Sequence, residues 1–228
     1  MTAEIKQRID EQIRELCQAI GLPPGFYGRL LEEPSDWAFL VQLQVIAEAA
    51  IAQRVVKQLK QEKTFDHVSR LNLDGKTGKL QLALTLDILD AGSADALRAL
   101  TACRNRFAYR IANVEASLER FGASLDANTK VDLLRKMGSL QPEDESAERD
   151  ADFPRFGSRL RQRLWLSTAI ALGKVADDRI HRQLLDLRQD LERSQRSEAE
   201  TRRPVPRTLL DFYAKNDEET SPSEREAK

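Results

Sequence analysis

The sequence predicts an all-α fold, a helical bundle with a long C-terminal helix and a disordered tail. Gly and Pro are scarce, with 10 and 8 among 228 residues, while Ala, Leu, Glu, Gln, Arg and Lys are abundant. Apolar residues recur at spacings of three and four and seldom alternate, which is typical of amphipathic helices. Helix-ending signals punctuate this pattern, such as Gly21 followed by Pro23 and Pro24.

The N-terminal half divides into five expected helices, over residues 5–20, 37–61, 65–71, 77–90 and 94–112. Ser35 or Asp36 is expected to cap the second helix. The core face of that helix is assigned to five apolar residues: Val41, Val45, Ile51, Val55 and Leu59. The turn-prone residues 72–75 precede the fourth helix, and a helix-entry turn is the interpretation for the glycines and lysines of 75–79. Gly92 is expected to end the fourth helix and Ser93 to cap the fifth.

The pattern weakens after residue 112, and residues 114–121 are helical or irregular. Asp126 or Asn128 is expected to cap a helix ending at Gly138. The expected organisation is a bundle over 1–138, an acidic linker over 139–154, one long helix over 155–200 and a disordered tail over 201–228. In the long helix, apolar residues spaced 4, 3 and 4 predict either a short coiled-coil seam or packing against the bundle: Ile180, Leu184, Leu187 and Leu191.

Composition excludes several classes of protein. Lys and Arg number 36 against 37 Asp and Glu, so the net charge of -1 gives no strong field for non-specific nucleic-acid binding. Two Cys and two widely separated His argue against a disulfide framework, a metal site or a metal cofactor, and no cofactor is expected. The N-terminus has no apolar signal region, and the apolar window 164–175 is shorter than the roughly twenty residues of a membrane span. We therefore expect a cytoplasmic protein that does not enter a membrane.

Two charged residues fall on apolar helix faces. Arg104 lies seven residues after Leu97, four after Leu100 and three before Phe107. Glu48 is the only charged residue between Trp37 and Gln53. A charge on such a face is costly unless it is paired. The hypothesis is that Glu48 and Arg104 face each other across the bundle or meet at a subunit interface, either as a structural ion pair or at the border of an anion-binding cleft.

Two other features have alternative interpretations. The run Arg155, Arg159, Arg161 and Arg163 is either a contact for nucleic acid or an acidic partner, or a solvated start of the long helix. Cys103 precedes Arg104 directly, so its pKa could be lowered, although a buried structural thiol is the simpler interpretation.

Residues 104–109, Arg-Asn-Arg-Phe-Ala-Tyr, resemble the R-N-x-x-[AV]-H motif of the HEPN superfamily (higher eukaryotes and prokaryotes nucleotide-binding). The resemblance is closest to the mannitol operon repressor family and related uncharacterised bacterial proteins. The order of flanking segments is also similar, with Val-Ile-Ala-Glu-Ala-Ala at 45–50, Ser-Arg-Leu-Asn at 69–72 and Asn-Val-Glu at 113–115. The resemblance covers about residues 36 to 140.

This resemblance implies an α-helical bundle that forms a homodimer with the motif helices facing each other. In active members the motif arginine and histidine cleave RNA without a metal. By position, Arg104, Asn105 and Glu48 correspond to the motif arginine, the asparagine and the acid of the earlier helix, and Tyr109 stands in place of the histidine. A phenol with a reference pKa of about 10 is a poor base at pH 7, although it donates hydrogen bonds and stacks on bases.

The predicted function is therefore a non-catalytic, HEPN-like regulatory or interaction protein, which either regulates transcription through a partner or binds RNA. Arg104, Arg106 and Arg110 are its candidate RNA-binding or anion-binding residues. Direct DNA binding is not expected, because no helix-turn-helix signature or basic recognition helix is visible. The alternative is a metal-independent ribonuclease of the toxin or phage-defence type, with Arg104, Asn105, Tyr109 and Glu48 as its catalytic residues.

Overall fold

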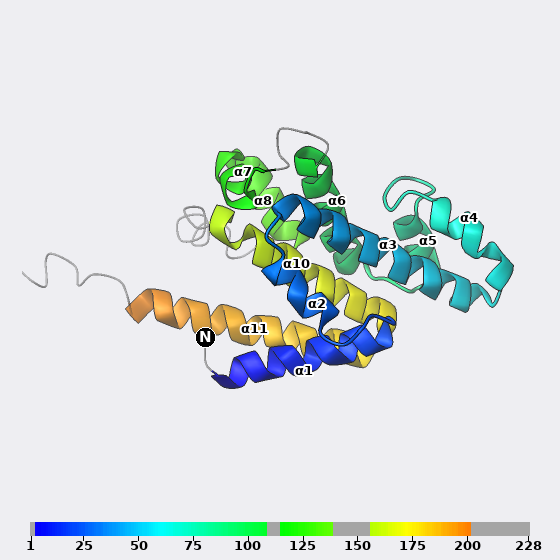
Figure 1. Cartoon of the computed structure of the whole chain (residues 1–228), viewed down its shortest axis with the longest axis horizontal. Coiled ribbons are helices and arrows are strands. Elements are labelled where there is room, and N and C mark those ends of the chain that lie inside the picture. Colours follow the sequence, from blue (N-terminus) through cyan, green and yellow to red (C-terminus); the bar gives the residue numbers. More distant parts are fainter. Residues whose placement is uncertain (1–2, 109–114, 139–155, 202–228) are drawn as a thin grey trace, which may run out of the picture.

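A computed structural model describes residues 3–108, 115–138 and 156–201, and their regular structure is entirely helical (Figure 1). The all-α prediction is confirmed. The helices are α1 (Ala3–Ala19), α2 (Phe26–Arg29), α3 (Asp36–Leu59), α4 (Phe65–Arg70), α5 (Lys79–Thr85), α6 (Ala91–Ala108), α7 (Leu118–Ser124), α8 (Ala127–Lys136), α10 (Phe156–Ala176) and α11 (Asp178–Thr201), with short 3-10 turns η1 (Leu30–Glu32) and η2 (Glu62–Thr64). The predicted linker and tail, like residues 109–112 of the fifth expected helix, lie outside the described residues.

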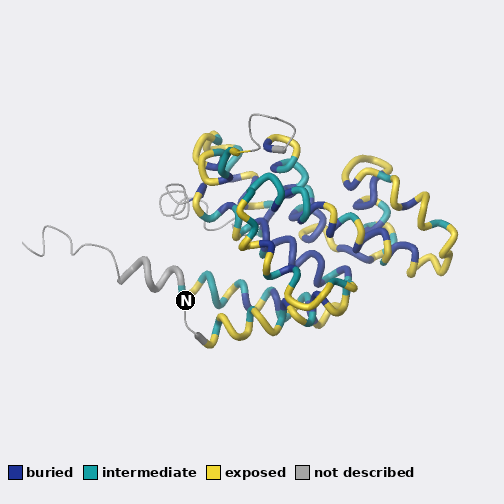
Figure 2. The backbone as a smooth tube through the Cα atoms, viewed as in Figure 1, coloured by how far each residue is buried: buried dark blue, intermediate teal, exposed yellow. Residues whose placement is uncertain are grey.

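Helix α10 lies at the centre of the bundle and packs against α1, α3, α6, α7 and α11 (Figures 1 and 2). Its residues Leu160, Leu164 and Leu172 are fully buried. Small residues let neighbouring helices approach α10 closely. A Cβ at Gly157 would lie 2.2 Å from the carbonyl oxygen of Glu119, so glycine is required where α7 crosses α10.

The single long C-terminal helix predicted for 155–200 is wrong, because the chain turns at Asp177 between α10 and α11. The Asp177 carboxylate accepts a hydrogen bond from the backbone N–H of Arg179 at 2.6 Å and so helps to start α11. Helix α11 folds back along α10 and also lies against α1. Ion pairs of Arg8 with Asp190 and of Glu15 with Arg179, at 2.7 and 2.9 Å, show that α1 and α11 are antiparallel.

The apolar residues of α11 that are spaced 4, 3 and 4 pack within the chain. Ile180, Leu184 and Leu187 are at most 3% exposed against the rest of the bundle. Of the two interpretations of this pattern, packing against the bundle is therefore confirmed.

Several predicted helix ends are confirmed. Ser35 caps α3 by accepting a hydrogen bond from the N–H of Ala38 at 3.2 Å, and Asp126 caps α8 by accepting one from Thr129 at 2.9 Å. The boundary predicted at Gly92 and Ser93 is wrong. Helix α6 already begins at Ala91, because Asp90 accepts a hydrogen bond from the N–H of Ser93 at 2.7 Å.

Helix α3 has the length and composition of a membrane span, but 61% of its most apolar window is buried inside the bundle. Its core face differs from the predicted one. Val45 is 58% exposed and Leu59 is 38% exposed, whereas Phe39, Leu40 and Leu43 are fully buried. Of the five predicted positions, Ile51 and Val55 are confirmed because both are fully buried. The difference lies toward the first half of the helix, where the bundle buries Phe and Leu side chains instead of Val45.

Arg161 of α10 joins three elements at the N-terminal end of α3. Its guanidinium pairs with Asp36 at 2.7 Å and donates to the carbonyl oxygens of Leu30 and Glu33 at 2.8 and 2.5 Å. The second oxygen of Asp36 accepts from the N–H of Leu118 at 2.7 Å, which fixes the start of α7. Arg161 is therefore a structural residue, and neither interpretation of the basic run applies to it.

Candidate functional site

The candidate residues of the R-N motif lie at the C-terminal end of α6. Arg104 is half-buried there, and Asn105 and Arg106 are exposed. Tyr109 and Arg110 lie outside the described residues. Of the five candidate residues in and next to the motif, the structure therefore places Arg104, Asn105 and Arg106 at one end of one helix.

The buried face of α6 explains how this end is positioned. Leu97, Leu100 and Phe107 are fully buried, as the apolar stripe predicted, and Cys103 is 1% exposed. The ring of Phe107 packs edge-on against Phe121 of α7, with the ring centroids 5.5 Å apart. Cys103 rather than Arg104 thus fills the buried position in the stripe, and Arg104 lies at its edge with part of its side chain in solvent.

Arg104 is oriented by its neighbour in sequence. Its Nη1 donates a hydrogen bond to the amide oxygen of Asn105 at 2.9 Å. A guanidinium has five N–H donors in a planar fork, so this bond occupies one donor and restrains the plane of the group. Such a fork matches the oxygens of a phosphate or carboxylate.

Within the chain Glu48 does not pair with Arg104 across the bundle, and the alternative of a pair at a subunit interface stays a prediction. Its carboxylate lies 3.5 Å from the ammonium nitrogen of Lys79, and it accepts a hydrogen bond from the Nε2 of Gln44 at 2.8 Å. The predicted need for a neutralising cation is correct, but α5 supplies that cation instead of α6. In the single chain the carboxylate of Glu48 is engaged in holding α5 against α3.

Lys79 is a residue that sequence reasoning missed. It is the first residue of α5, only 1% of it is exposed, and its ammonium group also donates to the carbonyl oxygen of Leu71. The predicted turn before it is present, because Gly78 precedes the helix. The signal in the sequence is that Lys79 lies four residues before the buried Ala83 on the same helical face.

The Cys103 thiol and the His181 imidazole both lie in the packed interior of the bundle or at its edge. Burial raises the pKa of the Cys103 thiol to about 12, although Arg106 acts in the opposite direction, so the interpretation as a buried structural thiol is supported. His181 Nδ1 lies 2.9 Å from the carbonyl oxygen of Ile170, and its Nε2 lies 3.8 Å from Asp90, which precedes α6. Asp90 is fourteen residues before Arg104, about 20 Å along the helix axis.

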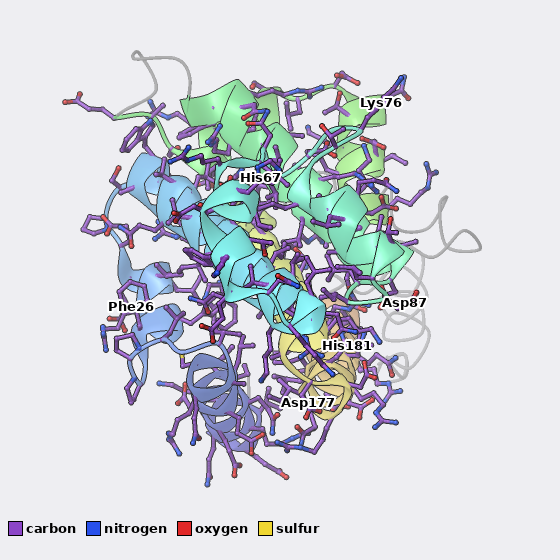
Figure 3. The ribbon with its side chains drawn as sticks, turned by 90° about the vertical axis from the view of Figure 1, so that its right-hand side faces the viewer. Phe26, His67, Lys76, Asp87, Asp177 and His181 are labelled. Carbon is purple, nitrogen blue, oxygen red and sulfur yellow. The ribbon has the colours of Figure 1, made fainter. Side chains whose placement is uncertain are left out.

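His67 lies exposed on α4 (Figure 3). Among the described residues no group of three or more His, Cys, Asp or Glu side chains is arranged to hold a metal ion.

Comparisons with protein-family models, with curated proteins and with solved structures found no match to this chain. The resemblance to the HEPN superfamily therefore stays a prediction that rests on the motif residues and on the order of the segments around them.

Proposed function

We propose that the protein is a non-catalytic, HEPN-like regulatory protein that binds RNA through the C-terminal end of α6. The observation that carries the proposal is the hydrogen bond from Arg104 to Asn105, which holds a guanidinium at a partly exposed helix end. Arg106 adds a second, exposed cation in the same turn of the helix. The oriented guanidinium of Arg104 suits a phosphate of RNA, whereas Arg106, two residues on, lies on a different face of the helix and would add only to the local positive field.

Binding without cleavage is the form of this function that the residues favour. Tyr109 occupies the motif position of the histidine, and a phenol is a poorer general base at neutral pH than an imidazole. Glu48, the other candidate for proton transfer, is hydrogen-bonded to Gln44 and paired with Lys79. On these grounds Arg104 would hold a phosphate while neither Tyr109 nor Glu48 activates the 2′-hydroxyl, and the protein would regulate by occupying the RNA.

The proposal includes a cytoplasmic homodimer. Val45 of α3 is 58% exposed and Ala49, one turn further on, is exposed as well, so a dimer interface on this face of α3 would bury both apolar side chains. A monomeric mass in light scattering would remove the dimer from the proposal.

RNA binding by the Arg104→Ala variant tests the function. Fluorescence anisotropy with a labelled single-stranded RNA of mixed sequence measures the dissociation constant at fixed salt. Because hydrogen bonds to charged groups contribute about 1.5–3 kcal/mol, we expect binding to weaken about tenfold to a hundredfold.

The matched control is Arg14→Ala, which removes an exposed arginine from α1 and changes the net charge equally. Its dissociation constant should stay within about twofold of wild type, because a distant surface charge contributes little at moderate salt. Equal affinities of the Arg104→Ala and Arg14→Ala proteins would contradict the proposed surface.

A further inference from the structure

A second surface with the properties of a binding site lies at the other end of α3. The chain reverses at Lys60, which has a φ of 53°, and η2 and the start of α4 fold back along the last turns of α3. Between them is an open groove of about 800 Å³. Figure 3 looks onto this end of the molecule, with α4 in front.

The groove concentrates positive charge. Lys57, Lys60 and Lys63 line it, against one carboxylate, Glu62. In the described parts of the chain no hydrogen bond or ion pair engages the ammonium groups of these three lysines. The whole protein carries a net charge of -1, so this excess of cations is a local feature rather than part of a general basic surface.

The groove also contains an aromatic ring and two amides. Phe65 lies at its edge and is 41% exposed, although a ring of this size is usually buried. Only Val68 of the neighbouring α4 is buried, so α4 adds little to the core. Gln53 and Gln61 contribute side-chain amides that donate and accept hydrogen bonds.

We infer that this groove binds a single-stranded polynucleotide. Its phosphates would lie against Lys57, Lys60 and Lys63, and one unpaired base would stack on Phe65. Cationic grooves with aromatic stacking platforms are the usual means of binding single strands without sequence preference. An acidic peptide would cover Phe65 only if it carried an aromatic or arginine side chain at the right place, whereas every nucleotide brings both a phosphate and a base that stacks, so the polynucleotide accounts for the groove most simply.

The inference does not depend on the proposed function, because it uses different residues at a different place. Gln53 lies seventeen residues after Asp36, about 26 Å along α3. Asp36, at the opposite end of α3 from the groove, accepts a hydrogen bond from Leu118 of α7. Helix α7 also contacts the end of α6 that carries Arg104, because Phe121 packs against Phe107. The groove and the Arg104 surface can therefore be tested with separate variants of the same full-length protein.

The test is binding of a 12-nucleotide oligo-U and of an oligo-dT of equal length, each over a series of salt concentrations. In the Lys57→Gln, Lys60→Gln, Lys63→Gln triple variant, the slope of log K against log salt should fall by about 2, since each phosphate contact contributes about 0.7. The control carries three equivalent changes at exposed positions elsewhere: Lys6→Gln, Arg14→Gln and Arg182→Gln.

The Phe65→Leu variant keeps an apolar side chain but removes the stacking face. It should weaken binding about tenfold while leaving the salt slope unchanged. Binding of either oligonucleotide with these variant effects supports the inference, and a difference between them identifies RNA or DNA as the strand.

The inference is overturned if neither oligonucleotide binds at low salt, or if the triple variant matches its charge control. An acidic peptide that competes as well as oligo-U, together with no effect of Phe65→Leu, would overturn it in favour of a protein partner. Loss of binding in the groove variants but not in Arg104→Ala would support the groove and contradict the proposed function. Loss of binding in Arg104→Ala but not in the groove variants would support the proposed function and overturn the inference about the groove.

Discussion

Replacement of Arg161 by Met tests whether the charges at the start of α3 hold the bundle together. Met keeps an unbranched stem that packs over Phe39, where the guanidinium carbon now lies 4.5 Å from the ring centroid. The substitution removes the ion pair to Asp36 and the two hydrogen bonds to the carbonyl oxygens of Leu30 and Glu33. Asp36 then keeps its hydrogen bond from the backbone N–H of Leu118, but its other oxygen loses the guanidinium.

The magnitude follows from those three contacts. Each hydrogen bond contributes about 1 kcal/mol net, and the partly solvated ion pair adds about 1 kcal/mol more, well below the roughly 3–5 kcal/mol for breaking a fully buried pair. The side chains of Arg161 and Asp36 are 21% and 15% exposed, so solvent screens the pair only in part. We expect a loss of about 3 kcal/mol, which lowers Tm by roughly 6–12 °C in a chain of this size.

Urea unfolding followed by circular dichroism measures this loss. The control is Arg193→Met, because Arg193 is 75% exposed and its nitrogen lies 3.4 Å from Asp190, so its removal should cost at most about 0.5 kcal/mol. A double-mutant cycle with Asp36→Asn should return a coupling energy above about 1 kcal/mol. A loss in Arg161→Met no larger than in Arg193→Met would refute this reasoning.

Two further predictions concern packing and titration. Gly157→Ala should lower the free energy of unfolding in urea by about 2 kcal/mol, because the added Cβ meets the backbone of α7. The control is Gly28→Ala, whose added Cβ meets nothing within 4 Å and should leave the stability unchanged. Equal stabilities of the two variants would contradict the close crossing of α7 and α10. Burial raises the pKa of Cys103 from 9.0 to about 12, so its stabilising contribution is present below pH 9 and is lost as the pH rises toward 12. Cys103→Ala should therefore lose less stability than wild type between pH 9 and 11, and an identical pH dependence would show that the thiol titrates normally.

Local signals predicted the helix starts that depend on one side chain. Ser35 and Asp126 are caps because a short polar side chain reaches the N–H three residues on, and that geometry needs no knowledge of the rest of the fold. The turn at Asp177 was missed because Ala-Asp-Asp carries neither Gly nor Pro, and the residues on both sides favour helix. The packing of α11 against α1 and α10, together with the cap that Asp177 gives to α11, makes the break favourable.

The candidate site was predictable in part. Spacing alone identified Glu48 as a carboxylate in need of a cation, but it could not identify Lys79, which an intervening loop and a short helix bring to α3. Spacing also placed Arg104 on the apolar stripe of α6, whereas the burial of Cys103 shows that the stripe is centred one residue earlier at this point. Which cation pairs with Glu48, and which residue of α6 faces the core, depend on how the helices cross, and the spacing of residues along the sequence does not contain that information.

The most direct test of the proposed function examines binding and RNA integrity in the same sample. Wild-type protein is incubated with end-labelled single-stranded RNA, and each aliquot is divided between a native gel and a denaturing gel. We predict a shifted band on the native gel and full-length RNA on the denaturing gel, with the shift reduced in Arg104→Ala. Cleavage by the wild type that disappears in Arg104→Ala, or the absence of any shift, would contradict the account.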